Sequence, residues 1–399
     1  MRHSTDWRAV LAAALCGLAV AINVGKVPIA MGALRTEFGL SLVAAGWVSS
    51  MINTLGASTG ILFGLLGDRV GALRLCYAGL GASIVGGVLG LVAGGETALL
   101  ASRFLEGAGV VAVAVSAPAL LTSATVPSDR RFALGIWSSY LPAGVGVVML
   151  LAPLVTGIAG WRGLWVLSLL ILALAALGIR RFQASYDLPH HPAPDDLPDS
   201  PWHIARQALA QPAPWLLALA MLSWTLQHYA LIIWLPTFLM EQRGLGLLAT
   251  SLLSCLMVLA NVPGNLLGGS LLQRDYRRGN LIAFASLLSG LAGFGIFLDG
   301  LPDLLRYALC VLLSFIGGLI PASVLSASAQ LAKTPKQIGT LQGLFMQVGN
   351  MGPFVGPPLI AALVAASGLW RDALWVTASA AAGGIVLGLA LRRLEPHCG

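Results

Sequence analysis

Long apolar segments, separated by short polar turns, recur along the whole chain of 399 residues. A helix rises 1.5 Å per residue, so about 20 apolar residues are enough to cross the hydrocarbon core of a bilayer, which is about 30 Å thick. Only 10% of the residues are charged, whereas a soluble domain carries about 25%. The chain is therefore predicted to cross a membrane many times, with most of its surface facing lipid.

The apolar segments predict an all-α membrane protein of twelve transmembrane helices. The predicted spans are 9–34, 41–67, 73–94, 97–125, 133–157, 162–182, 214–240, 246–272, 280–298, 304–331, 338–366 and 372–391. The longest polar segment, 183–213, is predicted to be a cytoplasmic linker between an N-terminal six-helix half (1–182) and a C-terminal six-helix half (214–399). The first span has no small-residue cleavage site, so we expect a retained helix and not a signal peptide.

The basic residues predict the orientation. With both termini in the cytoplasm, sixteen lysines and arginines lie in the cytoplasmic segments and four, Arg35, Arg162, Arg243 and Arg371, in the opposite loops. This asymmetry follows the positive-inside rule and predicts cytoplasmic termini in an inner or plasma membrane. The basic residues lie at helix ends, and no basic stripe is interleaved with aromatic residues. The net charge of +7 therefore does not indicate a nucleic-acid partner.

The two halves contain related sequences. The segment Arg103–Pro118 begins with arginine and ends with proline fifteen residues later, as does Arg306–Pro321. The pair Trp161–Arg162 recurs as Trp370–Arg371. These correspondences occur in the same order at offsets near 205, which predicts a six-plus-six duplication. Many transporters build a site near the middle of the membrane from such repeats.

The loop after the second span, Gly64–Gly71, reads Gly-Leu-Leu-Gly-Asp-Arg-Val-Gly. It resembles the major facilitator superfamily signature Gly-x-x-x-Asp-Arg-x-Gly, although the next basic residue comes only at Arg74. The resemblance covers the whole chain and implies the twelve-helix major facilitator fold. The segments 23–28, 228–239 and 261–268 resemble a narrower branch, the cyanate and 2-nitroimidazole transporter-like proteins.

The same resemblance implies that the signature loop controls gating. The carboxylate of Asp68 is expected to pair with Arg130 or Arg131 in one conformation and to separate from them in the other. An alternative is a solvated turn whose basic residues only determine topology. The predicted gating residues are Gly64, Asp68, Arg69, Gly71, Arg130 and Arg131.

Five ionisable residues are predicted at membrane depth, where a charge is costly and indicates function: Lys26, Arg103, Glu106, His228 and Arg306. They lie on the first, fourth, seventh and tenth spans, which line the central cavity in the fold that the resemblance implies. Arg306 is close to a helix end, so its side chain could instead reach the membrane interface. Together with polar neighbours they give the predicted substrate-binding set Asn23, Lys26, Arg103, Gln227, His228, Arg306 and Gln347.

The roles within this set have alternatives. Lys26 has no acidic residue within four positions, so it binds either a ligand or Glu106. Arg103 and Glu106 are three residues apart and share a helix face, so they either neutralise each other or separate when a substrate reaches Arg103. Glu106 is the predicted proton carrier, and His228, whose ordinary pKa is about 6.5, is the alternative.

The excess of positive charge predicts a small anionic solute, carried by alternating access and coupled to protons. The alternative is a proton-coupled exporter of drugs or metabolites in which Glu106 binds cations. We find no nucleophile–base constellation, ATPase motif or metal spacing, and the five cysteines are scattered, so no enzyme and no cofactor are predicted. The expected partners are a small-molecule substrate, protons and the lipid bilayer, and the protein is expected to be a monomer.

Overall fold

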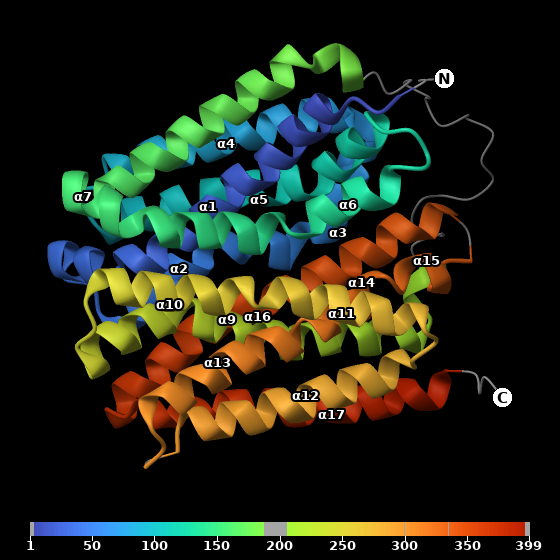
Figure 1. Cartoon of the computed structure of the whole chain (residues 1–399). Helices are drawn as coiled ribbons and strands as arrows, with labels where there is room; N and C mark the ends of the chain where they lie inside the picture. Colours follow the sequence, from blue (N-terminus) through green and yellow to red (C-terminus); the bar gives the residue numbers. More distant parts are fainter. Residues whose placement is uncertain (1–3, 187–205, 299, 334, 396–399) are drawn as a thin grey trace.

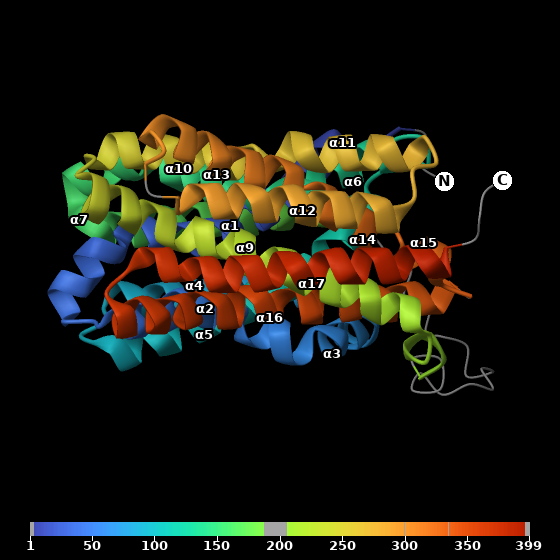
Figure 2. The same cartoon turned by 90° about the horizontal axis from the view of Figure 1, so that it is seen from below.

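The computed structural model describes residues 4–186, 206–298, 300–333 and 335–395. The structure is a bundle of helices that run side by side along one long axis (Figures 1 and 2). The first part of the chain forms α1 (Trp7–Phe38), α2 (Leu42–Ser50), η1 (Met51–Asn53), α3 (Thr54–Val70), α4 (Ala72–Leu91), α5 (Glu96–Ser123), α6 (Arg130–Ser138), α7 (Tyr140–Arg181) and η2 (Gln183–Tyr186). The second part forms α9 (Pro212–Arg243), α10 (Leu247–Leu259), α11 (Asn261–Gln273), α12 (Arg278–Ile296), α13 (Asp303–Gly317), α14 (Leu319–Leu325), α15 (Ser328–Leu331), α16 (Pro335–Ser367), η3 (Trp370–Asp372) and α17 (Ala373–Leu394).

Ten helical stretches among the described residues are long and apolar enough to cross a membrane. One of them, α7, has 42 residues and contains non-helical backbone at Ala159 and Gly160. Gly160 has a φ of +60°, which a residue with a side chain rarely adopts. The chain turns back on itself there (Figure 1), between the predicted spans 133–157 and 162–182. The protein is therefore a multi-pass membrane protein.

The second predicted span, 41–67, is divided in the structure. It consists of α2, the short η1 and α3, and α3 is kinked at Thr59, where φ is −132°. The predicted linker falls largely on residues 187–205, which lie outside the described residues. The α1 start and the α17 end lie at the same end of the bundle, and the α7 turn lies at the other (Figure 1).

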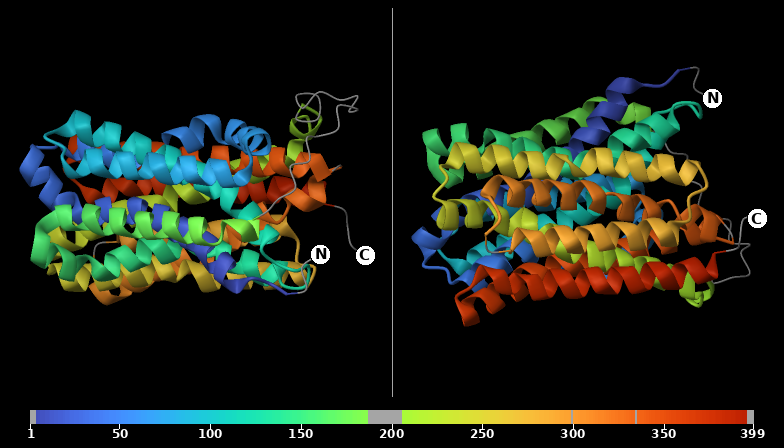
Figure 3. Two further views of the ribbon diagram at one scale, coloured as in Figure 1. Left: turned by 90° about the horizontal axis from the view of Figure 1, so that it is seen from above. Right: turned by 60° about the horizontal axis from the view of Figure 1, so that its bottom comes forward.

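Helices close in sequence pack together in two groups (Figure 3). In the first, α1 packs against α7 and α5, and α4 lies along α5. In the second, α12 lies along α17, and α9 packs against α16 and α17. The groups meet where α16 contacts α2 and α3, where α7 contacts α10, and where α1 contacts α9. Buried apolar residues continue across this contact as one core cluster.

Small residues allow a close approach between α4 and α5. A Cβ atom on Gly109 of α5 would collide with the Ser83 hydroxyl and the Gly79 carbonyl of α4. Small residues at such crossings bring helix backbones together in membranes, where packing takes over much of the role of the hydrophobic effect. This contact fixes the position of α5, which carries Arg103 and Glu106.

We predict that Gly109→Ala destabilises the protein by about 1–3 kcal/mol, the usual cost of overpacking. The matched control is Gly81→Ala on α4, because a Cβ atom at Gly81 has no neighbour within 4 Å. Both substitutions raise helix propensity equally, so a difference between them measures the collision. Thermal unfolding in detergent should show a lower midpoint for Gly109→Ala only. Equal midpoints would contradict the proposed tight contact.

Candidate functional site

A buried ionic cluster joins α1 and α5. The Lys26 ammonium on α1 donates to Glu106 Oε1 on α5 at 2.6 Å. Arg103, one turn before Glu106 on α5, donates to Glu106 Oε2. All three side chains are 0% exposed. One carboxylate is thus held between two cations, so the partner that the sequence left open for Lys26 is Glu106.

The remaining hydrogen-bonding capacity of Lys26 is also used. Its ammonium donates to Asn23 Oδ1 at 2.8 Å and to Ser168 Oγ on α7 at 3.2 Å. Together with Glu106 these are three acceptors for the three hydrogens of a lysine. The ammonium also lies 4.5 Å from the centre of the Trp165 ring, within the range of a cation–π contact. The positive charge is therefore held by contacts from α1, α5 and α7.

The cluster has spare donors and an excess of positive charge. Two cations and one carboxylate leave a net charge of +1. Four buried nitrogen atoms of the cluster have no hydrogen-bond partner among the described residues: Asn23 Nδ2, Arg103 Nε, Arg103 Nη2 and Trp165 Nε1. In an Asn amide, an Arg guanidinium and a Trp indole these nitrogen atoms are donors. A group that satisfied all of them would be an acceptor with negative charge.

Glycines of α4 make room for the cluster. A Cβ atom on Gly86 would lie 2.9 Å from Glu106 Cγ, and one on Gly90 would collide with the Trp165 indole nitrogen. The bare backbone of α4 therefore forms one wall, and α1, α5 and α7 form the others. The cluster is enclosed by the first group of helices.

A second polar group lies in the other group of helices. His228 on α9 has Nε2 2.9 Å from Ser314 Oγ on α13. Its ring stacks on Trp224, with the centres 4.8 Å apart. Asn261 of α11 donates to the Ser314 carbonyl at 2.9 Å. His228 Nδ1 and Gln227 Oε1 are buried and have no partner within the described part of the chain.

The other predicted substrate residues, Arg306 and Gln347, lie apart from the ionic cluster and from the polar residues around His228. Arg306 of α13 donates to the Leu298 carbonyl at 2.6 Å, in the loop after α12. Gln347 of α16 bonds across to α3, donating to the Ser58 carbonyl at 3.2 Å and accepting from Ile61 N at 3.2 Å. The structure thus brings together Asn23, Lys26, Arg103 and Glu106, and places the rest of the set elsewhere.

Two residues of the cluster were missed by sequence reasoning. Trp165 follows the repeated pair Trp161–Arg162 as Trp375 follows Trp370–Arg371, so the repeat carried a signal for it. Ser168 is one serine in an apolar helix and carried none, because serine is common at helix contacts in membranes.

Most of the predicted gating residues cannot be placed. Gly71 has a φ of +92° and precedes the first residue of α4, and Arg130 is the exposed first residue of α6. The side chains of Asp68, Arg69 and Arg131, and the surroundings of Gly64, lie outside what the structure describes. The gating role therefore stays a prediction.

An integral membrane bundle with buried charges at helix contacts is typical of transporters. A family model described as Major Facilitator Superfamily matches residues 11–357. The chain belongs to this superfamily, and it is a transporter and not an enzyme.

Curated relatives match most of the chain. It is 28% identical to the "Putative niacin/nicotinamide transporter NiaP" of Bacillus subtilis over 86% of this chain and 85% of that one. It is 26% identical to the "Probable sulfoacetate transporter SauU" of Cupriavidus necator, over 92% and 90%. It is also 26% identical to the "3-(3-hydroxy-phenyl)propionate transporter" of Escherichia coli K12, over 97% and 94%.

Solved structures show the same fold. A bacterial homolog of the human lysosomal transporter Spinster, in its inward-facing and unoccupied conformation, superposes with a TM-score of 0.78. The superposition covers 99% of this chain and 100% of that one, at 17% sequence identity. The all-helical major facilitator fold is therefore shared although the sequences have diverged.

We predict that Glu106→Ala lowers the free energy of unfolding by about 3–5 kcal/mol, because it leaves Lys26 and Arg103 buried without a carboxylate. The control is Glu37→Ala. It removes a carboxylate that is 38% exposed, binds Arg162 at 2.7 Å and accepts a hydrogen bond from Trp161 Nε1 at 2.6 Å. An exposed pair contributes about 1 kcal/mol or less, and a hydrogen bond about 1 kcal/mol. Denaturation in detergent micelles should separate the two variants. A loss for Glu106→Ala no larger than for Glu37→Ala would contradict the ionic cluster.

Proposed function

We propose that the protein is a secondary active transporter that moves a small organic anion across the plasma membrane by alternating access, coupled to protons. In this proposal twelve spans form two six-helix halves, 1–182 and 214–399, and both termini are cytoplasmic. The observation that carries it is the enclosed cluster of Lys26, Arg103 and Glu106, with its net charge of +1 and its donors that find no partner in the described part of the chain.

The charge and the donors support an anionic substrate. A carboxylate or sulfonate that approached Arg103 would neutralise the excess charge and accept from Nε and Nη2, which have no partner among the described residues. Bidentate contacts of this kind are the strongest that an arginine makes. The names of two relatives support the same class, because sulfoacetate and 3-(3-hydroxyphenyl)propionate are organic anions.

The energetic cost of the cluster supports a role beyond stability. Replacing a buried ion pair by apolar residues of similar volume is often neutral or stabilising by about 1–4 kcal/mol. If the cluster served only stability, apolar residues of similar volume would give a folded state that is equally or more stable. Three fully buried charges at helix contacts therefore favour a function that needs charge.

The geometry also suggests how the solute and the proton exchange. Both Lys26 and Arg103 bind the Glu106 carboxylate. An anion that draws Arg103 away leaves this carboxylate with Lys26 alone, and a proton is then the proposed replacement for the lost partner. Glu106 is thus the proposed proton carrier. His228, whose Nδ1 has no partner in the described structure, is the alternative.

Drug export is the second candidate. The chain is 26% identical to the "Quinolone resistance protein NorB" of Staphylococcus aureus, but only over 39% of its length. The matches to the organic-anion transporters cover more than nine tenths of the chain, so we favour anion transport. The branch of cyanate and 2-nitroimidazole transporter-like proteins stays a narrower proposal.

We predict that Lys26→Ala abolishes binding of the transported anion, because it lowers the net charge of the cluster from +1 to zero. The protein should still fold, because Arg103 still neutralises Glu106. A screen of nicotinate, sulfoacetate and 3-(3-hydroxyphenyl)propionate by thermal stabilisation should find a ligand of the wild type, since a ligand of the folded state raises stability by mass action. Lys26→Arg should keep part of the binding. Undiminished stabilisation of a folded Lys26→Ala protein would refute the assignment.

We predict that reconstituted wild type accumulates its anion when an inward proton gradient is imposed, and that Glu106→Gln keeps exchange but loses accumulation. The amide keeps the shape of the carboxylate but cannot carry the proton. The control is Glu37→Gln, outside the cluster, which should accumulate normally. Loss of accumulation in His228→Gln alone would move the carrier to the imidazole, and a wild type indifferent to the gradient would exclude proton coupling.

A further inference from the structure

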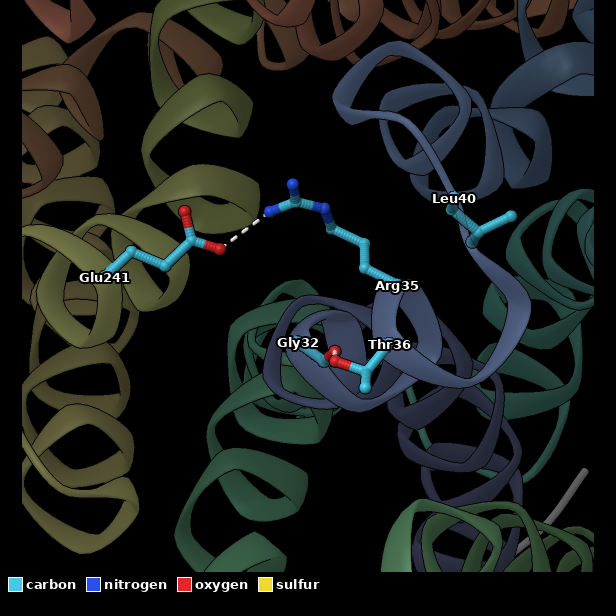
Figure 4. A pocket seen from close by; sticks show the side chains of 5 residues that line it. All are labelled: Gly32, Arg35, Thr36, Leu40 and Glu241. Carbon is cyan, nitrogen blue, oxygen red and sulfur yellow. Dashed lines mark hydrogen bonds and ion pairs between the residues drawn. The ribbon is translucent and has the colours of Figure 1, made fainter.

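An ion pair joins the two groups of helices at the end of the bundle where α7 turns back (Figure 4). Arg35, in the last turn of α1, donates to Glu241 Oε1 in the last turn of α9 at 2.6 Å. Five ion pairs are formed among the described residues. Of these, only this one connects the first group of helices to the second.

The pair lies in a recess of about 380 Å³. The residues that line it come from the end of α1, from the turn that follows α1, and from the end of α9: Gly32, Arg35, Thr36, Leu40 and Glu241 (Figure 4). The Arg35 and Glu241 side chains are 28% and 42% exposed, so solutes in the surrounding water have access to both. In the orientation proposed above, this water is outside the cell.

The Arg35 guanidinium can bind more than its one partner. Its Nη1 is bound to Glu241, and its side chain is 28% exposed. The two terminal nitrogen atoms, Nη1 and Nη2, form a fork that binds both oxygens of one carboxylate. A carboxylate that bound end-on to this fork would take Nη1 from Glu241.

The two partners occupy matching places in the repeat. The bounds of α1, Trp7–Phe38, and of α9, Pro212–Arg243, differ by 205 at both ends. Each helix ends at a left-handed glycine, Gly39 and Gly244, and both have a φ of +63°. The pair therefore links equivalent last turns of the two groups of helices, so its loss would remove an attraction between them.

We propose that the recess is an outer binding site for organic anions, in which the anion displaces Glu241 from Arg35 and so releases α9 from α1. This inference rests on the proposed anion transport and extends it to a second site. Arg35 and Lys26 are nine residues apart on α1, about 14 Å at 1.5 Å per residue. One carboxylate replaces another on Arg35, so Arg35 keeps a charge-assisted contact throughout the exchange, and the anion arrives on the helix that leads to the cluster.

Gly32 provides a way to block the recess. A Cβ atom on Gly32 would have no neighbour within 4 Å, although Gly32 lines the recess. A leucine there fills open space and leaves the ion pair of Arg35 and Glu241 in place. Gly32→Leu therefore tests for an anion site independently of the ion pair.

The experiment measures uptake of nicotinate, sulfoacetate and 3-(3-hydroxyphenyl)propionate by vesicles that contain the full chain. Arg35→Gln and Gly32→Leu should each raise KM about three- to tenfold, as expected for loss of one partly exposed charge-assisted contact, with little change in the maximal rate. Glu241→Gln should lower KM, because it removes the competing carboxylate. The control, Arg162→Gln, removes the pair with Glu37 inside the first group of helices and should leave KM unchanged.

The outcomes separate this inference from the proposed function. Wild-type KM in both Arg35→Gln and Gly32→Leu, with Lys26→Ala inactive, overturns the outer site and leaves anion transport at the cluster. Raised KM in both, with Lys26→Ala fully active, supports the outer site and refutes the role of Lys26. If KM rises in Arg35→Gln but not in Gly32→Leu, the pair of Arg35 and Glu241 has a structural role only, and the proposed anion site is overturned. If wild type takes up none of the three anions, both proposals fail.

Discussion

The site depends on one carboxylate held between two cations. Glu106 binds Lys26 of α1 and Arg103 of its own helix, so it fixes the distance between α1 and α5 and cancels a charge that neither helix could bury alone. The other features follow from it. The glycines of α4 make room for the carboxylate, and Ser168 and Trp165 of α7 complete the surroundings of Lys26.

Features that depend on composition and on local spacing were predictable from the sequence. The apolar segments predicted the helices, the i, i+3 spacing predicted contact of Arg103 with Glu106, and the residues near Gly160 marked a turn between spans. Contacts between segments that are distant in the chain could not be predicted from the sequence. Lys26 had both a ligand and Glu106 as candidates, and only packing of α1 on α5 selects one. The kink at Thr59 was not predicted, although Gly60 follows it and the Thr59 hydroxyl donates to the Leu55 carbonyl at 2.7 Å, a bond that often bends helices.

The two groups of helices share their architecture but not their chemistry. Arg103 and Arg306 begin the same repeated segment, yet the residue three positions after Arg306 is Leu309 instead of a glutamate. Arg306 accordingly binds a backbone carbonyl in a loop. The second group instead carries a neutral polar set around His228 and Ser314. The two groups of helices thus carry different sets of polar side chains.

The complete burial of Glu106 has a consequence for leakage. The carboxylate is 0% exposed to solvent, and all three hydrogens of its lysine partner are in use. A proton can therefore reach it only when the helices around it separate. In a carrier of the proposed kind, this makes helix movement the slow step of protonation, so protons do not slip through between transport cycles. The number of protons moved with each solute would then depend on helix packing. Variants that admit water to the cluster would move protons without solute, so the ratio of protons to solute would rise.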